Sequence, residues 1–170
     1  MWLLMRFAAC LIFAVILSGL GFALAQEKHQ IDPMLPGSLN PEPLPPLQNP
    51  NAASTPAKEL FARKSTPVPG RPRSIGIHSK GCLAGAVPLA MNGPGWQVMR
   101  PSRNRYWGHP QAVHFVERLA KNAKKIGWNG LLIGDIAQPR GGPMLADHSS
   151  HQNGLDVDVW FTPMPDHVQS

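Results

Sequence analysis

The strongest hydrophobic pattern lies between residues 110 and 126. Its apolar residues recur at steps of three and four positions: Val113, Val116, Leu119, Ala120, Ala123 and Ile126. This spacing places them on one face of an α-helix. Pro110 suits the first turn of a helix, Gly127 can end it, and the lysines at positions 121, 124 and 125 favour its negative end. The segment therefore predicts an amphipathic helix.

Shorter apolar runs, separated by proline and glycine, predict strands. The first three are interpreted as short strands or loops: Ser74 to Ile77, Cys82 to Leu89 and Trp96 to Met99. Gly130 to Gly134 predicts a further strand, and a loop rich in glycine and proline follows at residues 138–145. The last run alternates, which places Leu155, Val157, Val159 and Phe161 on one face and Asp156, Asp158 and Trp160 on the other.

The first 64 residues predict no packed domain. Residues 1–25 have the features of a cleaved export signal, because Arg6 precedes an apolar run that ends in the small-x-small sequence Ala23-Leu24-Ala25. A retained membrane anchor is the alternative, since a membrane span needs about 20 apolar residues. Residues 26–64 are rich in proline and predict an extended or disordered linker. The ordered domain is expected over residues 65–170.

Export of the protein affects which partners its net charge suits and whether its cysteines can form disulfides. The formal net charge is +6, and the loss of Arg6 with the signal lowers it to +5. A basic exported protein suits an anionic wall or membrane surface, and the export signal argues against nucleic acid as a partner. Removal of Cys10 leaves Cys82 as the one cysteine in an oxidising compartment. This indicates either a missing disulfide partner or a buried free thiol.

The candidate chemistry is concentrated just before and within the last predicted strand. His148, His151 and Asp158 offer the imidazole and carboxylate donors that zinc sites combine. Gly154 permits a sharp turn, which can fold His151 back over the strand face that presents Asp158. Asp156 shares that face and could accept a histidine proton or bind substrate. On spacing alone, the competing interpretation is a polar turn with surface histidines and a solvated Asp158.

The wider sequence around these residues resembles a known group of enzymes. The pattern Ser149-x-His151-x-x-Gly154-x-x-x-Asp158 is similar to the zinc-binding half of the peptidases that group lysostaphin, D-alanyl-D-alanine peptidases and hedgehog domains. Over residues 65–162 the chain resembles the penicillin-insensitive murein endopeptidases. The blocks that carry this resemblance are Pro69-Gly70, Ser74-Ile75-Gly76, Gly81-Cys82, Gln97 to Arg100, Arg105 to Pro110, Leu132 to Asp135 and His148 to Asp158.

The resemblance implies a fold, a cofactor and a substrate. Such enzymes are periplasmic zinc hydrolases that cut the D-alanyl–diaminopimelate bond between murein strands. The implied cofactor is Zn²⁺ and the implied partner is the peptidoglycan cross-link, with membrane contact only through the signal segment before cleavage. His148, His151 and Asp158 match the first three zinc-site positions of the family. The implied fold is α+β, with a mostly antiparallel sheet, flanking helices and a zinc cleft.

The sequence departs from the family pattern after Asp158. The family takes its fourth ligand from a downstream His-x-His motif, whose other histidine is thought to act in catalysis. No such motif follows Asp158 in the 170 residues. Cys82 matches a position that pairs, in the family, with a cysteine near the C-terminus, which this sequence lacks. We therefore expect the catalytic residues downstream of Ser170, a fold that is incomplete at its C-terminus, weak zinc binding and poor turnover.

Two other functions remain open at this point. One is a catalytically dead zinc- or murein-binding protein made from a naturally shortened gene, and the other is a D,D-carboxypeptidase of the same group. Arg100 and Arg105 are candidates to bind a substrate carboxylate through their planar forks, against the alternative of ordinary surface charge. His109 could line the cleft or cap the following helix. No chemistry is assigned to the remaining candidates, which are His78 and His114, expected to face solvent, and Asp135, expected to end a strand.

Overall fold

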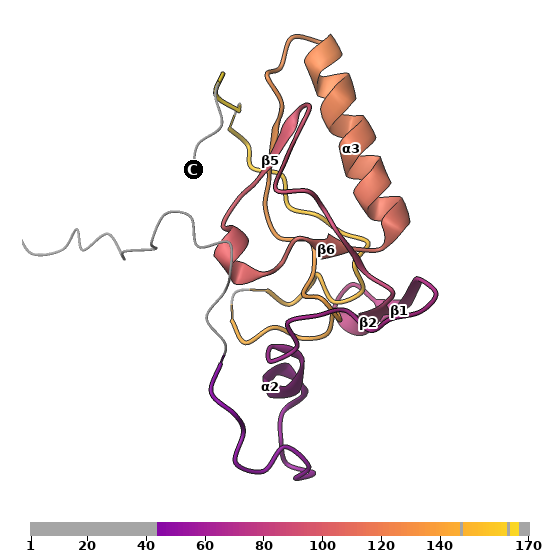
Figure 1. Ribbon diagram of the computed structural model, residues 1–170, viewed down its shortest axis with the longest axis vertical. Helices are drawn as coiled ribbons and strands as arrows, with labels where there is room; N and C mark the ends of the chain where they lie inside the picture. Colours follow the sequence, from indigo (N-terminus) through magenta and orange to yellow (C-terminus); the bar gives the residue numbers. More distant parts are fainter. Residues whose placement is uncertain (1–43, 147, 163, 167–170) are drawn as a thin grey trace, which may run out of the picture. The chain divides into compact units, whose positions relative to one another are not determined.

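The computed structural model describes residues 44–146, 148–162 and 164–166. The expected signal and the first part of the expected linker, residues 1–43, lie outside the described residues. The elements are α2 (Ala57–Phe61), β1 (Arg73–Ile77), β2 (Lys80–Ala84), β3 (Val87–Pro88), β4 (Asn92–Gly93), β5 (Trp96–Val98), the 3₁₀ helix η1 (Pro101–Arg103), β6 (Trp107–Gly108), α3 (Pro110–Lys125) and β7 (Leu131–Ile133) (Figure 1). Within the described part of the chain, no helix is both long and apolar enough to span a bilayer.

The long helix α3 supplies one side of the main core, as its periodicity predicts. Its buried face consists of Val113, Val116, Ala120 and Ala123. These side chains pack against β5 and β7 in a cluster that also contains Leu89, Trp96, Val98, Leu131, Ile133 and Ile136. Leu119 and Ile126, which the periodicity placed on the same face, are exposed. Gly127 follows the end of the helix with a φ of +93°, the left-handed conformation that ends helices.

The strands form three small sheets, and Leu83 of β2 lies outside this core, in a smaller cluster with Ala86 and Ala137. β1 pairs with β2, β3 pairs with β6, and the third sheet has the order β4–β5–β7. All pairings are antiparallel except that of β5 with β7, in which Trp96 is opposite Leu131 and Val98 is opposite Ile133. The α+β fold class is therefore confirmed. Because β5 and β7 run in parallel, their carboxyl ends lie at the same edge of the third sheet.

The run Cys82 to Leu89, interpreted as a short strand or loop, is not one element, because it divides between β2 and β3. Gly85 separates them with a φ of +60° and donates its N–H to the carbonyl of Val68 at 2.9 Å. A Cβ at Gly85 would lie 2.6 Å from the carbonyl oxygen of Gly70. The chain therefore bends sharply at a position where only glycine fits.

The predicted strand Leu155 to Phe161 is also wrong in part. The segment forms a single antiparallel bridge, between Val159 and Ile133. Of its expected apolar face, Val157 packs against the main core, whereas Leu155, Val159 and Phe161 are exposed. The segment runs along β7, and no second layer of the described residues covers its outer face. Its alternation therefore does not correspond to a buried face.

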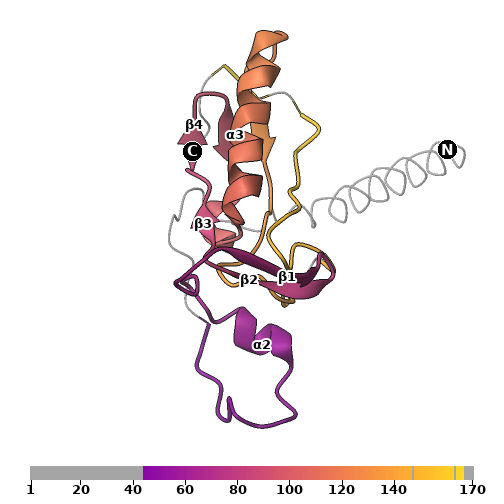
Figure 2. The ribbon, with the colours of Figure 1, turned by 90° about the vertical axis from the view of Figure 1, so that its right-hand side faces the viewer.

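The prediction of a disordered linker up to residue 64 differs from the structure near its end. Residues Ala57–Phe61 form the short helix α2, which lies beside the β1–β2 hairpin (Figure 2). The Phe61 ring packs on Gly142, where a Cβ would lie only 2.3 Å from it. Leu60 and Phe61 also border an apolar cavity of about 310 Å³ together with Cys82, which is a free, half-buried thiol. The packing of Phe61 on Gly142 explains why this end of the proline-rich stretch is ordered.

Candidate metal centre

The loop that carries the two histidines is tied to the body of the domain by backbone hydrogen bonds. Gly154 adopts a φ of +72°, and its carbonyl accepts the N–H of His109 at 2.9 Å. Gln152 donates its N–H to the carbonyl of His78 at 3.0 Å. His151 itself has a φ of +62°, which is uncommon for a residue with a side chain. The predicted sharp turn at Gly154 is confirmed, and it presents His151 toward the segment that contains Asp158.

The structure brings the three predicted ligands together. One donor atom from each of His148, His151 and Asp158 lies within 4.8 Å of the others. Nε2 of His151 is 3.3 Å from Oδ1 of Asp158, and the two imidazole rings meet edge to face with their centroids 4.8 Å apart. His151 is buried, whereas the Asp158 side chain is 47% exposed. The cluster is therefore anchored on the protein side and open to solvent on the other.

Asp156 lies behind His151. Its Oδ2 accepts the backbone N–H of His151 at 3.0 Å and lies 3.1 Å from His151 Nδ1. The second contact has a short distance but not the direction of a hydrogen bond. Among the described residues, the buried Nδ1 therefore has no hydrogen-bond partner, and neither has Oδ1 of Asp156. A buried polar atom without a partner costs free energy, which makes this imidazole a site where a ligand or a small rearrangement is favoured.

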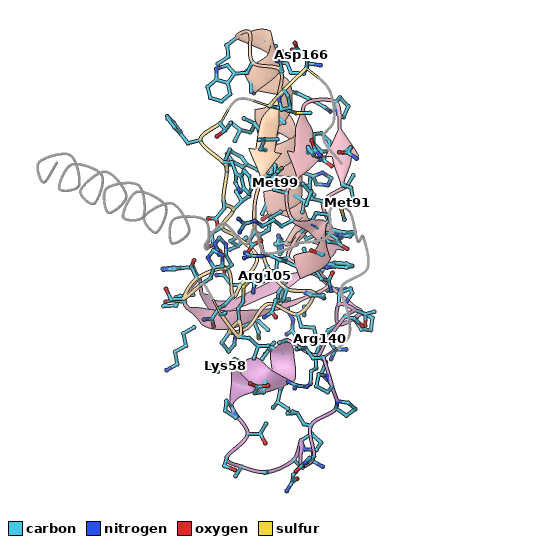
Figure 3. The ribbon with its side chains drawn as sticks, turned by 90° about the vertical axis from the view of Figure 1, so that its left-hand side faces the viewer. Lys58, Met91, Met99, Arg105, Arg140 and Asp166 are labelled. Atoms are coloured by element: carbon cyan, nitrogen blue, oxygen red, sulfur yellow. The ribbon has the colours of Figure 1, made fainter. Side chains whose placement is uncertain are left out.

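A second cluster, which the sequence analysis missed, adjoins the first. Oδ2 of the buried Asp135 lies 3.0 Å from Nε2 of His148 and also contacts Arg103 and Arg105. Asp135 lies two residues after the end of the apolar strand β7, and a charged residue close to the end of a buried strand was the available signal. Figure 3 shows Arg105, labelled, in the middle of the described domain.

Arg100 and Trp160 form one wall of a small pocket next to the candidate metal ligands. The pocket has a volume of about 100 Å³, and its lining also includes Met99, Gly134, Asp135, His148 and Asp158. The guanidinium of Arg100 lies over the Trp160 ring, 5.4 Å from its centroid. Arg100 has a φ of +52°, and such backbone strain is often found at functional sites.

The other predicted residues are placed away from this pocket or in fixed contacts. Arg105, whose side chain is 13% exposed, donates to Asp135 at 2.9 Å. His109 is the N-cap of α3, where its Nδ1 accepts the N–H of Gln111 at 3.3 Å. His114 is exposed on α3 beside Glu117. The structure thus brings Arg100, but not His109, to the candidate ligands.

Comparisons with known proteins identify relatives of the chain. The family model described as penicillin-insensitive murein endopeptidase matches residues 74–170. The protein of that name from Yersinia enterocolitica is 44% identical to this chain over 113 residues, or 66% of the chain. The one from Klebsiella pneumoniae is 43% identical over 109 residues, or 64% of the chain. The one from Haemophilus influenzae is 47% identical over 98 residues, or 56% of this chain. The matched regions are 40%, 38% and 34% of these relatives, so the chain spans about two fifths of their length or less.

Proposed function

Because the chain belongs to the penicillin-insensitive murein endopeptidase family, we propose that it supplies three zinc ligands to an endopeptidase of peptidoglycan cross-links. The proposed ligands are His148, His151 and Asp158, and the proposed location is the periplasm. The single observation that carries the proposal is the convergence of these three donors within 4.8 Å. The names of the relatives support the substrate class, and the donor set supports the metal.

The residues fit a zinc ion on two independent grounds. Two donors bound to one tetrahedral zinc at about 2.0–2.2 Å stand about 3.3–3.6 Å apart. The separation of His151 Nε2 from Asp158 Oδ1 is 3.3 Å. The buried Nδ1 of His151 faces the Asp156 carboxylate, and a carboxylate behind a metal-bound imidazole is a common arrangement. This gives Asp156 the proposed role of orienting His151.

The chemistry that follows is hydrolysis of a peptide bond. Zinc, when bound, supplies a Lewis acid and lowers the pKa of a water molecule to about 7. The protein residues hold the imidazoles and the carboxylate in place and leave the solvent side of Asp158 open for substrate. We propose that the bond cut is the D-alanyl–diaminopimelate bond of the cross-link.

Arg100 is the proposed substrate-binding residue of this site. Its guanidinium is exposed at the pocket rim, and its planar fork matches a carboxylate. Cross-linked wall peptides carry free carboxylates close to the scissile bond. A cation in the same pocket as His148 and Asp158 can therefore orient the peptide through such a carboxylate. Arg105 and His109 remain predicted substrate-binding residues. Before either can bind substrate, Arg105 has to leave Asp135 and His109 has to leave the start of α3.

The experiment combines zinc analysis with hydrolysis. Elemental analysis of the chain after equilibration with zinc should find the bound ion, and His151→Ala or Asp158→Ala should remove it. His114→Ala is the matched control, because that histidine is exposed on α3 and should leave the zinc content unchanged. Equal zinc in the chain with and without His151 would overturn the metal assignment.

Hydrolysis is measured in a full-length relative whose matching residues are replaced by residues 74–162 of this chain. We expect release of monomers from cross-linked muropeptide dimers, with free pentapeptides left uncut, and loss of the activity in the His151→Ala version. Cleavage of pentapeptides alone would contradict the proposed endopeptidase activity and indicate a carboxypeptidase. Unchanged turnover without His151 would exclude the site.

A further inference from the structure

Asp135 forms the most highly connected buried ion cluster of the described residues near the site. Its Oδ2 lies 3.1 Å from Arg103 Nη1, 2.9 Å from Arg105 Nη1 and 3.0 Å from His148 Nε2, and its side chain is only 6% exposed. A buried carboxylate needs such partners, because its charge is costly without them. The two arginines therefore fix the position of the oxygen that faces His148.

The backbone of the same residue holds a second candidate ligand. The carbonyl of Asp135 accepts the N–H of Asp158 at 3.0 Å, and the N–H of Gly134 donates to the carbonyl of Asp158 at 2.7 Å. A Cβ at Gly134 would lie 2.9 Å from Cβ of Asp158, so the two segments approach closely. Asp158 is thus held on both sides by two consecutive residues at the end of β7.

The contact with His148 has a chemical consequence. A neutral imidazole carries one proton, and the nitrogen that carries it cannot bind a metal. The nitrogen of His148 that faces the Asp135 carboxylate, at 3.0 Å, is Nε2, which leaves Nδ1 as the nitrogen for a metal. We infer that Asp135 is a positioning residue that selects the Nδ1-binding form of His148 and fixes Asp158, so that one buried carboxylic acid residue organises two of the three zinc ligands. The inference deepens the proposed zinc site and rests on it.

The first test needs no metal and no mutation of Asp135. In the metal-free full chain, nuclear magnetic resonance of isotope-labelled imidazole nitrogens should find the proton of neutral His148 on Nε2. The His148 signals are assigned by their loss in His148→Gln. A proton on Nδ1 would overturn the inference. Since this result does not depend on zinc, a protein that binds no zinc but shows the Nε2 proton would refute the proposed function and leave the tautomer assignment standing.

The second test measures zinc affinity by competition with a chelator. Asp135→Asn removes the charge that fixes His148, and loss of such a partner typically weakens metal binding by about 10- to 100-fold. Asp135→Glu keeps the carboxylate and should recover part of the loss. The control for general destabilisation is Trp96→Phe, which removes a hydrogen bond to Ala90 at 2.9 Å in the main core, apart from the ligands. It should lower the unfolding temperature and leave zinc affinity unchanged.

The outcomes separate a positioning role from a structural one. A folded Asp135→Asn variant that binds zinc as tightly as the wild type would overturn the inference. An equal loss of affinity in Trp96→Phe would do the same, because any destabilisation would then suffice. If Asp135→Asn does not fold, Asp135→Glu and the wild-type proton position decide the question.

Discussion

The guanidinium of Arg100 lies over the indole of Trp160, with its Cζ 5.4 Å from the ring centroid. The two residues come from different segments, one from the turn that precedes η1 and the other from the segment that contains Asp158. Both residues line the pocket beside the candidate metal ligands. A cation stacked on an aromatic ring keeps its in-plane donors free, so Arg100 can meet a carboxylate at the pocket rim.

Replacement of Arg100 by alanine should therefore weaken substrate binding without loss of zinc. A hydrogen bond to a charged group contributes about 1.5–3 kcal/mol, which corresponds to about 10- to 150-fold in Kd. Arg100→Lys should show an intermediate loss, because it keeps the charge but not the planar fork. Calorimetric titration with a cross-linked wall peptide measures both variants. Arg118→Ala, an exposed cation on α3, is the control, and an equal effect there would mean that only overall charge matters.

Gly154 provides a test of the loop that carries His151. Its φ of +72° costs a residue with a side chain about 1–2 kcal/mol, and a Cβ there would lie 2.5 Å from Cδ2 of the buried Leu83. With the cost of overpacking, Gly154→Ala should lower the free energy of unfolding by about 2–5 kcal/mol. Gly127→Ala is the matched control, because its φ is +93° but a Cβ there would meet no described residue within 4 Å apart from its neighbours in the chain. Urea unfolding should show a loss of only about 1–2 kcal/mol there; equal losses would mean that the contact with Leu83 is unimportant.

Elements with a dense local signal could be predicted from the sequence, and long-range contacts could not. The helix α3 carries its apolar spacing within sixteen residues, and the three candidate ligands lie within one short stretch. The ion cluster of Asp135 could not be predicted, because its partners Arg103 and Arg105 are 32 and 30 residues away in the chain. The pairing of β5 with β7 and the backbone hydrogen bonds from Ile136 and Ala137 to the carbonyl of Arg105 bring these segments together. The outer face of Leu155 to Phe161 was mispredicted for a related reason, since alternation does not tell whether a second layer covers a strand.

The central position of Ile133 predicts a large effect of truncation. Its side chain is fully buried between α3 and the third sheet. Ile133→Ala should cost about 2–5 kcal/mol of stability, because it removes buried methyl groups and leaves a cavity. The matched control is Ile126→Ala just after α3, where the side chain is 78% exposed and the change should stay within about 0.5 kcal/mol. Chemical unfolding of both variants measures the difference, and similar losses would contradict the assignment of the core.

Tyr106 offers an optical test of packing, because it is the only tyrosine of the chain. Burial raises the pKa of its phenol above the ordinary value of 10.0. The unfolded chain therefore loses this proton at a lower pH than the folded one, and the folded state should lose stability as the pH rises above about 10. Absorbance of the phenolate against pH should show a later transition in the native protein than in the denatured protein. Coincident transitions would place the phenol in water and contradict its packing beside Trp107.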